Sequence, residues 1–208
     1  MNQTDAMARA ARAKKVTWVG FWVNVVLSVA KIIAGIVGRS GAMIADGVHS
    51  ISDFVTDIIV IVFIGVSAKG ENTRFRYGHG KFETFATMLI SFALFAVAVG
   101  LFWTSFSQIV DALNGKVLPR PEMVALVMAF VSVVAKEWLF HYTRVAGEQM
   151  NSMALVANAW HHRSDAFSSI AVLVGIGCAM FLGERWRVLD PIAAATVSVF
   201  IALVAYRL

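Results

Sequence analysis

The sequence predicts an all-α, polytopic membrane protein with six transmembrane helices. Two compositional observations support this fold class: 59% of the 208 residues are hydrophobic and only 15% are charged, whereas a soluble domain usually has about a quarter charged residues. The third observation is length, because the apolar runs approach or exceed the roughly 20 residues that a membrane-spanning helix needs. A soluble helical bundle is therefore disfavoured, since a chain this apolar could not bury its side chains in one water-soluble core.

The first three helices are separated by glycine-containing and polar stretches. Residues 1–15 are polar and basic and are expected to form a cytoplasmic N-terminal segment, ahead of a six-helix membrane domain over residues 16–208. The apolar run that follows this segment is longer than the core of a signal peptide, which has about 7–15 residues, so it is expected to form the first membrane helix. The expected bounds are residues 16–38, 42–68 and 82–113, with breaks at Gly-Arg-Ser-Gly and at the polar stretch 69–80.

The last three helices are delimited by proline and glycine. Asn114-Gly115, Pro119 and Pro121 break the chain after the third helix. Gly183 suits the C-terminal cap of the fifth helix, and Pro191 is tolerated in the first turn of the sixth. The expected bounds are residues 122–144, 151–182 and about 190–208.

The distribution of basic residues predicts the orientation of these helices. The formal net charge is +5, and the basic residues lie mostly at the ends of apolar runs, so topology accounts for the charge better than nucleic-acid binding does. An even number of helices puts both termini on one side, which carries Arg9, Arg12, Lys14, Lys15, Lys69, Arg74, Arg76, Lys81, Arg144 and Arg207. The other side carries Arg39, Lys116, Arg120, Arg185 and Arg187. This bias predicts cytoplasmic termini.

The second expected helix carries an ionisable stripe. At about 100° per residue, Asp46, His49, Asp53 and Asp57 fall on one narrow face. His49 and Asp53 are four residues apart, so their side chains are neighbours on that face.

The fifth expected helix repeats this spacing with His161 and Asp165, and Asn158 and Ser169 extend the polar stripe. An ionised side chain at the centre of a bilayer costs at least about 2.5–3.5 kcal/mol. Interhelical hydrogen bonds that only hold the bundle together are one explanation. The duplicated pair favours a different one: two imidazoles and two carboxylates, which suit tetrahedral Zn²⁺. The ligand types leave Fe²⁺, Co²⁺, Cd²⁺ and Mn²⁺ open.

Three motifs occur in the order and in the helices that resemble the cation diffusion facilitator family, in its zinc- and iron-transporting form. The motifs are His49-Ser-Ile-Ser-Asp53, Tyr77-Gly-His-Gly-Lys81 and His161-His-Arg-Ser-Asp165. The resemblance covers the whole six-helix length. It implies a homodimeric, proton-coupled exporter of zinc and related divalent metals, in a bacterial inner (cell) membrane. It also implies a transport site made of His49, Asp53, His161 and Asp165, with His162 outside the ligand positions.

Two features depart from the family pattern. Many family members bind a second metal near the loop between the second and third helices, with an aspartate and two histidines. In this sequence His79 is retained, but Asn72 and Phe75 stand at the other ligand positions and Glu71 is only a partial substitute, so metal binding at this second site is disfavoured. The family also usually adds a C-terminal cytoplasmic domain that binds metal and supports dimerisation. The expectation here is a transmembrane transport domain without that C-terminal cytoplasmic domain.

The expected function is efflux of Zn²⁺ in exchange for protons. An imidazole has a reference pKa near 6.5, and metal binding needs neutral imidazole and ionised carboxylate, so it displaces protons. Asp46 and Asp57 lie about one turn on either side of the His49/Asp53 pair and are expected to attract cations toward it. Packing roles are favoured for Lys31 in the first helix and for Lys136-Glu137 in the fourth.

Other classes of function are alternatives to transport. A haem protein with His49 and His161 as axial ligands would not need an aspartate one turn from each histidine. A non-transporting metal sensor would use the same ligands, and a passive channel would move metal without a proton gradient. An enzyme is not expected, because a nucleophile–base pair and a His-Glu-xx-His motif are absent from the sequence. The single cysteine, Cys178, excludes an internal disulfide, and no cofactor is expected beyond the transported metal.

Overall fold

A computed structural model describes the backbone of residues 3–67 and 80–207, and the side chains of residues 15–54, 88, 91–152 and 155–206. All of the regular structure in these residues is helical, which confirms the predicted fold class. The elements are α1 (Gln3–Val37), α2 (Gly41–Ser67), α3 (Gly80–Leu113), α4 (Met123–Gln149), α5 (Met153–Phe181), a 3-10 helix η1 (Glu184–Val188) and α6 (Leu189–Arg207).

Five described segments are long and apolar enough to cross a membrane: Lys15–Val37, Ser91–Leu113, Met123–Gln149, Leu155–Phe181 and Glu184–Tyr206. Helix α2, with 27 residues, is the sixth long helix. Two bounds differ from the prediction by more than two residues. Helix α1 begins at Gln3, within the expected N-terminal segment. Helix α4 continues past Arg144 to Gln149, because no proline interrupts it and Arg144 Nε donates to Glu148 Oε1 at 2.7 Å.

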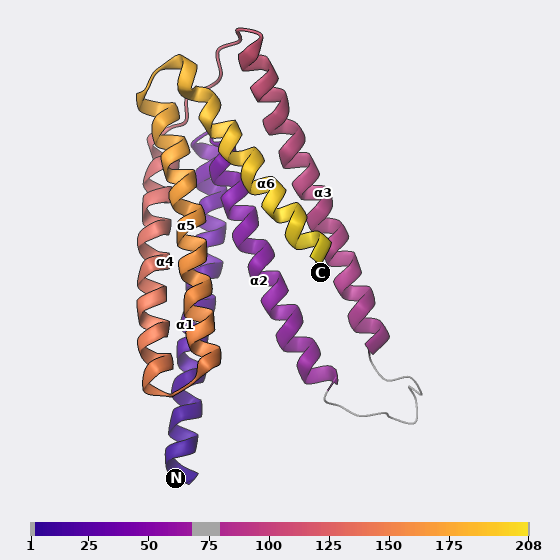
Figure 1. The fold of residues 1–208 in the computed structure, drawn as a ribbon, viewed down its shortest axis with the longest axis vertical. Coiled ribbons are helices and arrows are strands. Elements are labelled where there is room, and N and C mark those ends of the chain that lie inside the picture. The colour runs from indigo at the N-terminus through magenta and orange to yellow at the C-terminus, as the bar shows by residue number, and fades with distance from the viewer. Residues whose placement is uncertain (1–2, 68–79, 208) are drawn as a thin grey trace.

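The helices pack as neighbouring pairs, with α4 against α5, α1 against α2 and α3 against α6. Additional contacts join α1 to α4 and α2 to α6. In Figure 1, α1, α4 and α5 stand side by side, while α2 diverges from them toward the end of the molecule where the N-terminus lies. Helix α2 is therefore close to α5 only along part of its length, and this part carries the predicted ligands.

Small residues allow α1 and α2 to approach closely. A Cβ atom placed on Gly47 would lie 2.7 Å from Ile32 Cγ1, so only glycine fits at this crossing. Close contacts of this kind are typical of helices that pack within membranes. The hydrophobic effect does not drive helices together in lipid, so close van der Waals packing is needed instead. The Gly47 crossing brings the ionisable face of α2 next to α1.

The beginning of α2 is held by α6. Asp190 Oδ2 accepts a hydrogen bond from the backbone N–H of Gly41 at 2.8 Å, and Ser40 Oγ donates to Asp190 Oδ1. The carboxylate thus accepts a hydrogen bond from an N–H group that has no partner within the helix. Its negative charge also interacts favourably with the positive end of the helix dipole. This contact sets the position of the turns that follow it on α2.

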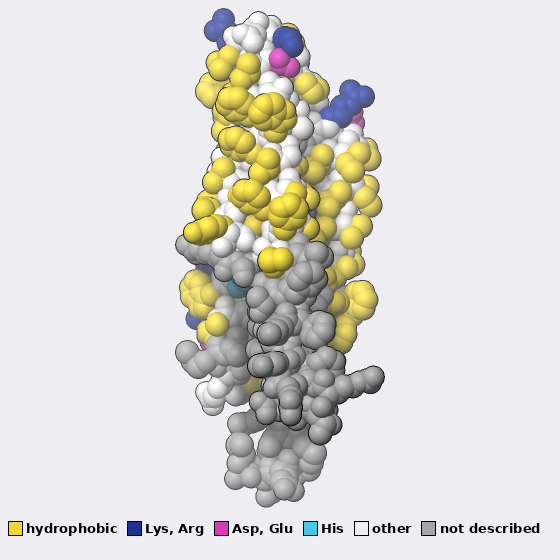
Figure 2. Space-filling view, turned by 90° about the vertical axis from the view of Figure 1, so that its right-hand side faces the viewer, with side chains coloured by type: hydrophobic (Ala, Val, Ile, Leu, Met, Phe, Trp, Pro, Cys, Tyr) yellow, Lys and Arg dark blue, Asp and Glu magenta, His cyan; other side chains and the backbone are white. Residues whose placement is uncertain are grey.

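The outer surface is apolar. In the face shown in Figure 2, hydrophobic side chains cover the described upper part, and charged side chains gather at its tip. Large exposed side chains include Phe92 (75%), Trp103 (72%) and Phe130 (59%). Such a surface is suited to lipid rather than water, and the protein is an integral membrane protein.

Candidate metal centre

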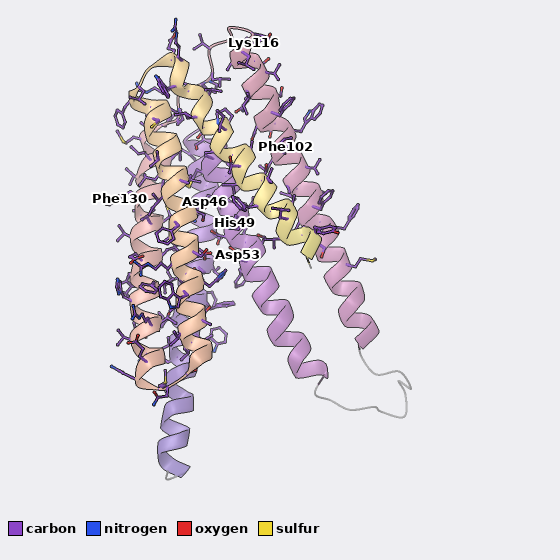
Figure 3. All side chains as sticks on the ribbon, viewed as in Figure 1. Asp46, His49, Asp53, Phe102, Lys116 and Phe130 are labelled. Atoms are coloured by element: carbon purple, nitrogen blue, oxygen red, sulfur yellow. The ribbon has the colours of Figure 1, made fainter. Side chains whose placement is uncertain are left out.

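Helix α2 presents one half of the candidate centre. Asp46, His49 and Asp53 lie on successive turns of α2, on the side next to α5 (Figure 3). His49 Nε2 lies 3.7 Å from Asp53 Oδ2, and their side chains are 17% and 15% exposed. The predicted pairing of His49 with Asp53 along the helix therefore brings an imidazole nitrogen and a carboxylate oxygen together at the edge of the bundle.

Helix α5 presents the other half. His161 Nδ1 lies 3.9 Å from Asp165 Oδ1. The His161 side chain is 43% exposed, whereas that of Asp165 is only 10% exposed. The pair therefore runs from an accessible imidazole to an enclosed carboxylate.

Three of the four predicted ligands converge. The ligand atoms of Asp53, His161 and Asp165 all lie within 4.8 Å of one another, and His49 joins this group through Asp53. For comparison, metal–ligand lengths of about 2.1 Å give a tetrahedral edge of about 3.4 Å. A shift of about one ångström in the side chains would close this group around an ion, which falls within ordinary rotamer adjustment.

Two polar atoms at this place lack a hydrogen bond among the described residues. They are His49 Nδ1 and Asp53 Oδ2, and both atoms are buried. A buried polar atom left without a partner costs about 1–3 kcal/mol. A cation bound to the carboxylate oxygen of Asp53 would remove this free-energy cost.

Lys136 is a member of the centre that was not predicted from the sequence. Its Nζ atom donates to Asp165 Oδ2 at 2.7 Å, and its side chain is only 3% exposed. Its sequence neighbour Glu137 turns away and lies 3.3 Å from His141 instead. Lys136 was expected only to pack within the bundle, whereas the structure shows that it contacts the predicted metal ligand Asp165. A lysine in the middle of a membrane helix was the available signal, since such a charge needs a partner.

Asp46 lies in a different polar network. Lys31 Nζ is 2.8 Å from Asp46 Oδ2 and donates to Ser50 Oγ at 3.0 Å and to Ser169 Oγ at 3.2 Å. Ser169 Oγ in turn donates to Asp46 Oδ2 at 3.1 Å. Both charged side chains are 1% exposed. Among the described residues, Asp46 is therefore enclosed with Lys31 and is not one of the converging ligands, although it shares their helix face.

His162 is buried beside the centre and does not join it. The residue is 2% exposed, and its Nε2 atom lies 3.5 Å from Asn158 Nδ2. A Cβ atom on Gly20 would lie 3.6 Å from the same nitrogen, so His162 packs against α1. Two further predicted site residues are Asp57 and His79. The side chain of Asp57 and the whole of His79 lie outside the described part of the structure.

Comparison with known proteins gives a consistent family. Residues 17–208 match the family model described as the cation efflux transmembrane domain. The magnetosome protein MamB of Magnetospira sp. is 32% identical over 99% of this chain and 67% of its own length. The manganese efflux system protein MneP of Bacillus subtilis is 33% identical over 98% of this chain and 68% of its own length.

Relatives also occur in eukaryotes. Metal tolerance protein C1 of Arabidopsis thaliana is 36% identical over 90% of this chain and 42% of its own length. The chain spans about half the length of the curated relatives that it matches, with shares from 39% to 68%. The family model covers nearly all of the helical region described above. The chain belongs to the cation diffusion facilitator family, of which it contains the cation efflux transmembrane domain.

Proposed function

We propose that this chain is the transport domain of an exporter of divalent transition-metal cations, and that it exchanges Zn²⁺ for protons. The observation that carries the proposal is the convergence of Asp53, His161 and Asp165 within 4.8 Å, with His49 beside Asp53. These ligands come from two different helices. A relative movement of α2 and α5 would therefore change the geometry of the site and give alternating access to it.

The choice of Zn²⁺ rests on the donor atoms. Two imidazole nitrogens and two carboxylate oxygens suit tetrahedral zinc, whereas Mn²⁺ prefers sites with more oxygen ligands and octahedral geometry. Mn²⁺ is the second candidate cargo, because the Bacillus subtilis relative is named a manganese efflux protein. Fe²⁺, Co²⁺ and Cd²⁺ are accommodated by the same ligand types.

Proton exchange is proposed from the chemistry of metal binding. A histidine that binds metal must be neutral and a carboxylate must be ionised, so arriving metal displaces protons from the site. Proton entry on release would then return the site to its metal-free form. The remaining parts of the proposal are a homodimer, a bacterial inner membrane and cytoplasmic termini, which are supported by the family resemblance and the bias of basic residues.

Transport by the full chain in proteoliposomes with an imposed pH gradient tests the proposal. Zn²⁺ flux should follow the gradient, and competition with Mn²⁺, Fe²⁺, Co²⁺ and Cd²⁺ ranks the cargo. Asp53→Ala and His161→Ala should abolish flux because each removes a ligand. The matched control is Asp111→Asn, which alters an exposed carboxylate paired with Lys116. Parent-like flux in both ligand variants would show that the site is wrong, and flux independent of the gradient would indicate a passive channel.

A further inference from the structure

We infer that Lys136 is a tethered cation that occupies the cargo carboxylate Asp165 and makes the site selective against hard divalent ions such as Mg²⁺. This inference rests on the proposed function, because it treats Asp165 as a ligand of the transported metal. It assigns to a lysine on α4 the role of a positioning and specificity-determining residue.

The two oxygens of Asp165 face different groups. Oδ1 lies 3.9 Å from His161 Nδ1, while Oδ2 accepts a hydrogen bond from Lys136 Nζ at 2.7 Å. A charge-assisted hydrogen bond of this length orients the carboxylate. Lys136 therefore directs one oxygen toward the converging ligands and holds the other itself.

Lys136 has few other ways to satisfy its charge. Among the described side chains, Asp165 is its hydrogen-bond and ion-pair partner. Lys31, the other lysine that is buried among the described residues, contacts Asp46 and two serines. An ammonium group that depends on a single carboxylate competes directly with any other cation that approaches that carboxylate.

The charge of the site explains the expected selectivity. With neutral histidines, Asp53 and Asp165 contribute −2 and Lys136 contributes +1, so an incoming ion meets a net charge of −1. Mg²⁺ and Ca²⁺ bind through oxygen ligands and negative charge, so the reduction of the net charge from −2 to −1 weakens their attraction to the site. Zn²⁺ also bonds to imidazole nitrogen, and this contribution is not removed by the lysine.

A metal competition experiment tests this role with the full chain in detergent or nanodiscs. Zn²⁺ binding is measured against a fluorescent zinc chelator, with and without millimolar Mg²⁺. In Lys136→Met, Mg²⁺ should lower the apparent affinity for Zn²⁺ by roughly tenfold, because the repulsion between cations is removed. The parent and Lys136→Arg, which keeps the charge, should be insensitive to Mg²⁺. The matched control is Lys116→Met. Lys116 lies just beyond the end of α3 (Figure 3), and the substitution breaks its 2.7 Å ion pair with Asp111 in the last turn of that helix.

A merely structural ion pair would change the stability of the protein without changing its metal selectivity. Zinc binding that is equally insensitive to Mg²⁺ in Lys136→Met and in the parent would therefore overturn the inference. Lys136→Gln serves if the methionine variant does not fold, because it keeps an N–H donor and removes the charge. A parent that binds no metal would instead refute the proposed function.

A second measurement follows metal binding in the parent protein and needs only the charge-conserving variant Lys136→Arg, for assignment. The side-chain ammonium signal of Lys136 is observed by NMR in protein containing isotope-labelled lysine, and is assigned by its loss in Lys136→Arg. Saturating Zn²⁺ should shift this signal, since a cation at Asp165 Oδ1 draws negative charge away from the carboxylate that the ammonium group contacts through Oδ2, whereas Mg²⁺ should leave it in place. A signal that zinc does not move would contradict the competition between lysine and cargo.

Discussion

Two buried lysine–aspartate pairs lie in the same bundle and differ in what surrounds them. Lys31 and Asp46 join α1 to α2 at 2.8 Å, with both side chains 1% exposed and two serines completing their hydrogen bonds. Lys136 and Asp165 join α4 to α5 at 2.7 Å, but the carboxylate is 10% exposed and also faces His161. The first pair is closed to other ions, whereas the second opens onto the candidate metal centre.

The comparison shows that a charge pair inside a membrane protein is not by itself a sign of function. Removing one partner of a buried pair is costly because the other charge is left without compensation. In an enclosed network, the uncompensated charge lowers the free energy of unfolding, because no ion from solution can replace the missing partner. Next to a metal centre, an arriving cation can take the place of the missing partner. The two pairs should therefore respond differently to the same substitution.

The largest effect is expected for Lys31→Met. Asp46 would remain buried without its counter-charge, which should lower the free energy of unfolding by about 3–5 kcal/mol. Thermal or denaturant unfolding in detergent, followed by helical circular dichroism, measures this loss. Lys116→Met provides the control, because an exposed pair contributes only about 0–1 kcal/mol. A loss for Lys31→Met no larger than that of the control would show that the enclosed pair does not stabilise the fold.

A smaller effect that zinc can reverse is expected for Lys136→Met. The loss of stability without metal should be less than for Lys31→Met, because the Asp165 side chain is 10% exposed, whereas that of Asp46 is only 1% exposed. At one hundred times its Kd, zinc stabilises any variant that keeps the site by about 2.7 kcal/mol, so the informative quantity is the rise in Tm at one fixed zinc concentration, compared with that of the parent. This rise should be larger for Lys136→Met than for the parent, because zinc replaces the missing counter-charge of Asp165 and no longer competes with the ammonium group. For Lys31→Met it should equal the rise of the parent, because Asp46 is not among the converging ligands. Equal rises for both variants would remove the distinction between the two pairs.

The smallest effect on stability is expected for Gly47→Ala. This substitution changes the packing of α1 against α2, next to the Lys31–Asp46 pair, without removing a charge. The new Cβ atom would lie 2.7 Å from Ile32 Cγ1 and push α1 away from α2, at a cost of about 1–3 kcal/mol. Gly100→Ala is the matched control, since a Cβ atom there meets nothing within 4 Å. Unfolding measurements should separate the two variants, and zinc binding should be unchanged in both. Equal stability would mean that the α1–α2 crossing tolerates a wider spacing.

The positions of the helices were largely predictable from the local pattern of apolar and polar residues. Apolar runs and their glycine and proline breaks identified the six long helices, because membrane length and backbone chemistry act on each segment separately. The extension of α4 to Gln149 was missed, since the ion pair between Arg144 and Glu148 leaves little hydropathy signal. The His–Asp spacing predicted which side chains share a face, because that follows from the helical repeat alone.

The partners of these side chains depended on packing between helices. Asp46 and Asp53 occupy the same stripe of α2, yet Asp46 pairs with Lys31 and Asp53 approaches His161 and Asp165. Lys136 reaches Asp165 from another helix, across 29 residues of sequence.

The sequence by itself determined the fold class, the family motifs and the face on which each histidine–aspartate pair lies. Only the tertiary structure decided which carboxylate is enclosed, which converges with the candidate ligands and which lysine lies beside it. The physical reason is that helical periodicity is local, whereas the choice of partner depends on how closely two distant helices approach, as at Gly47 and Ile32.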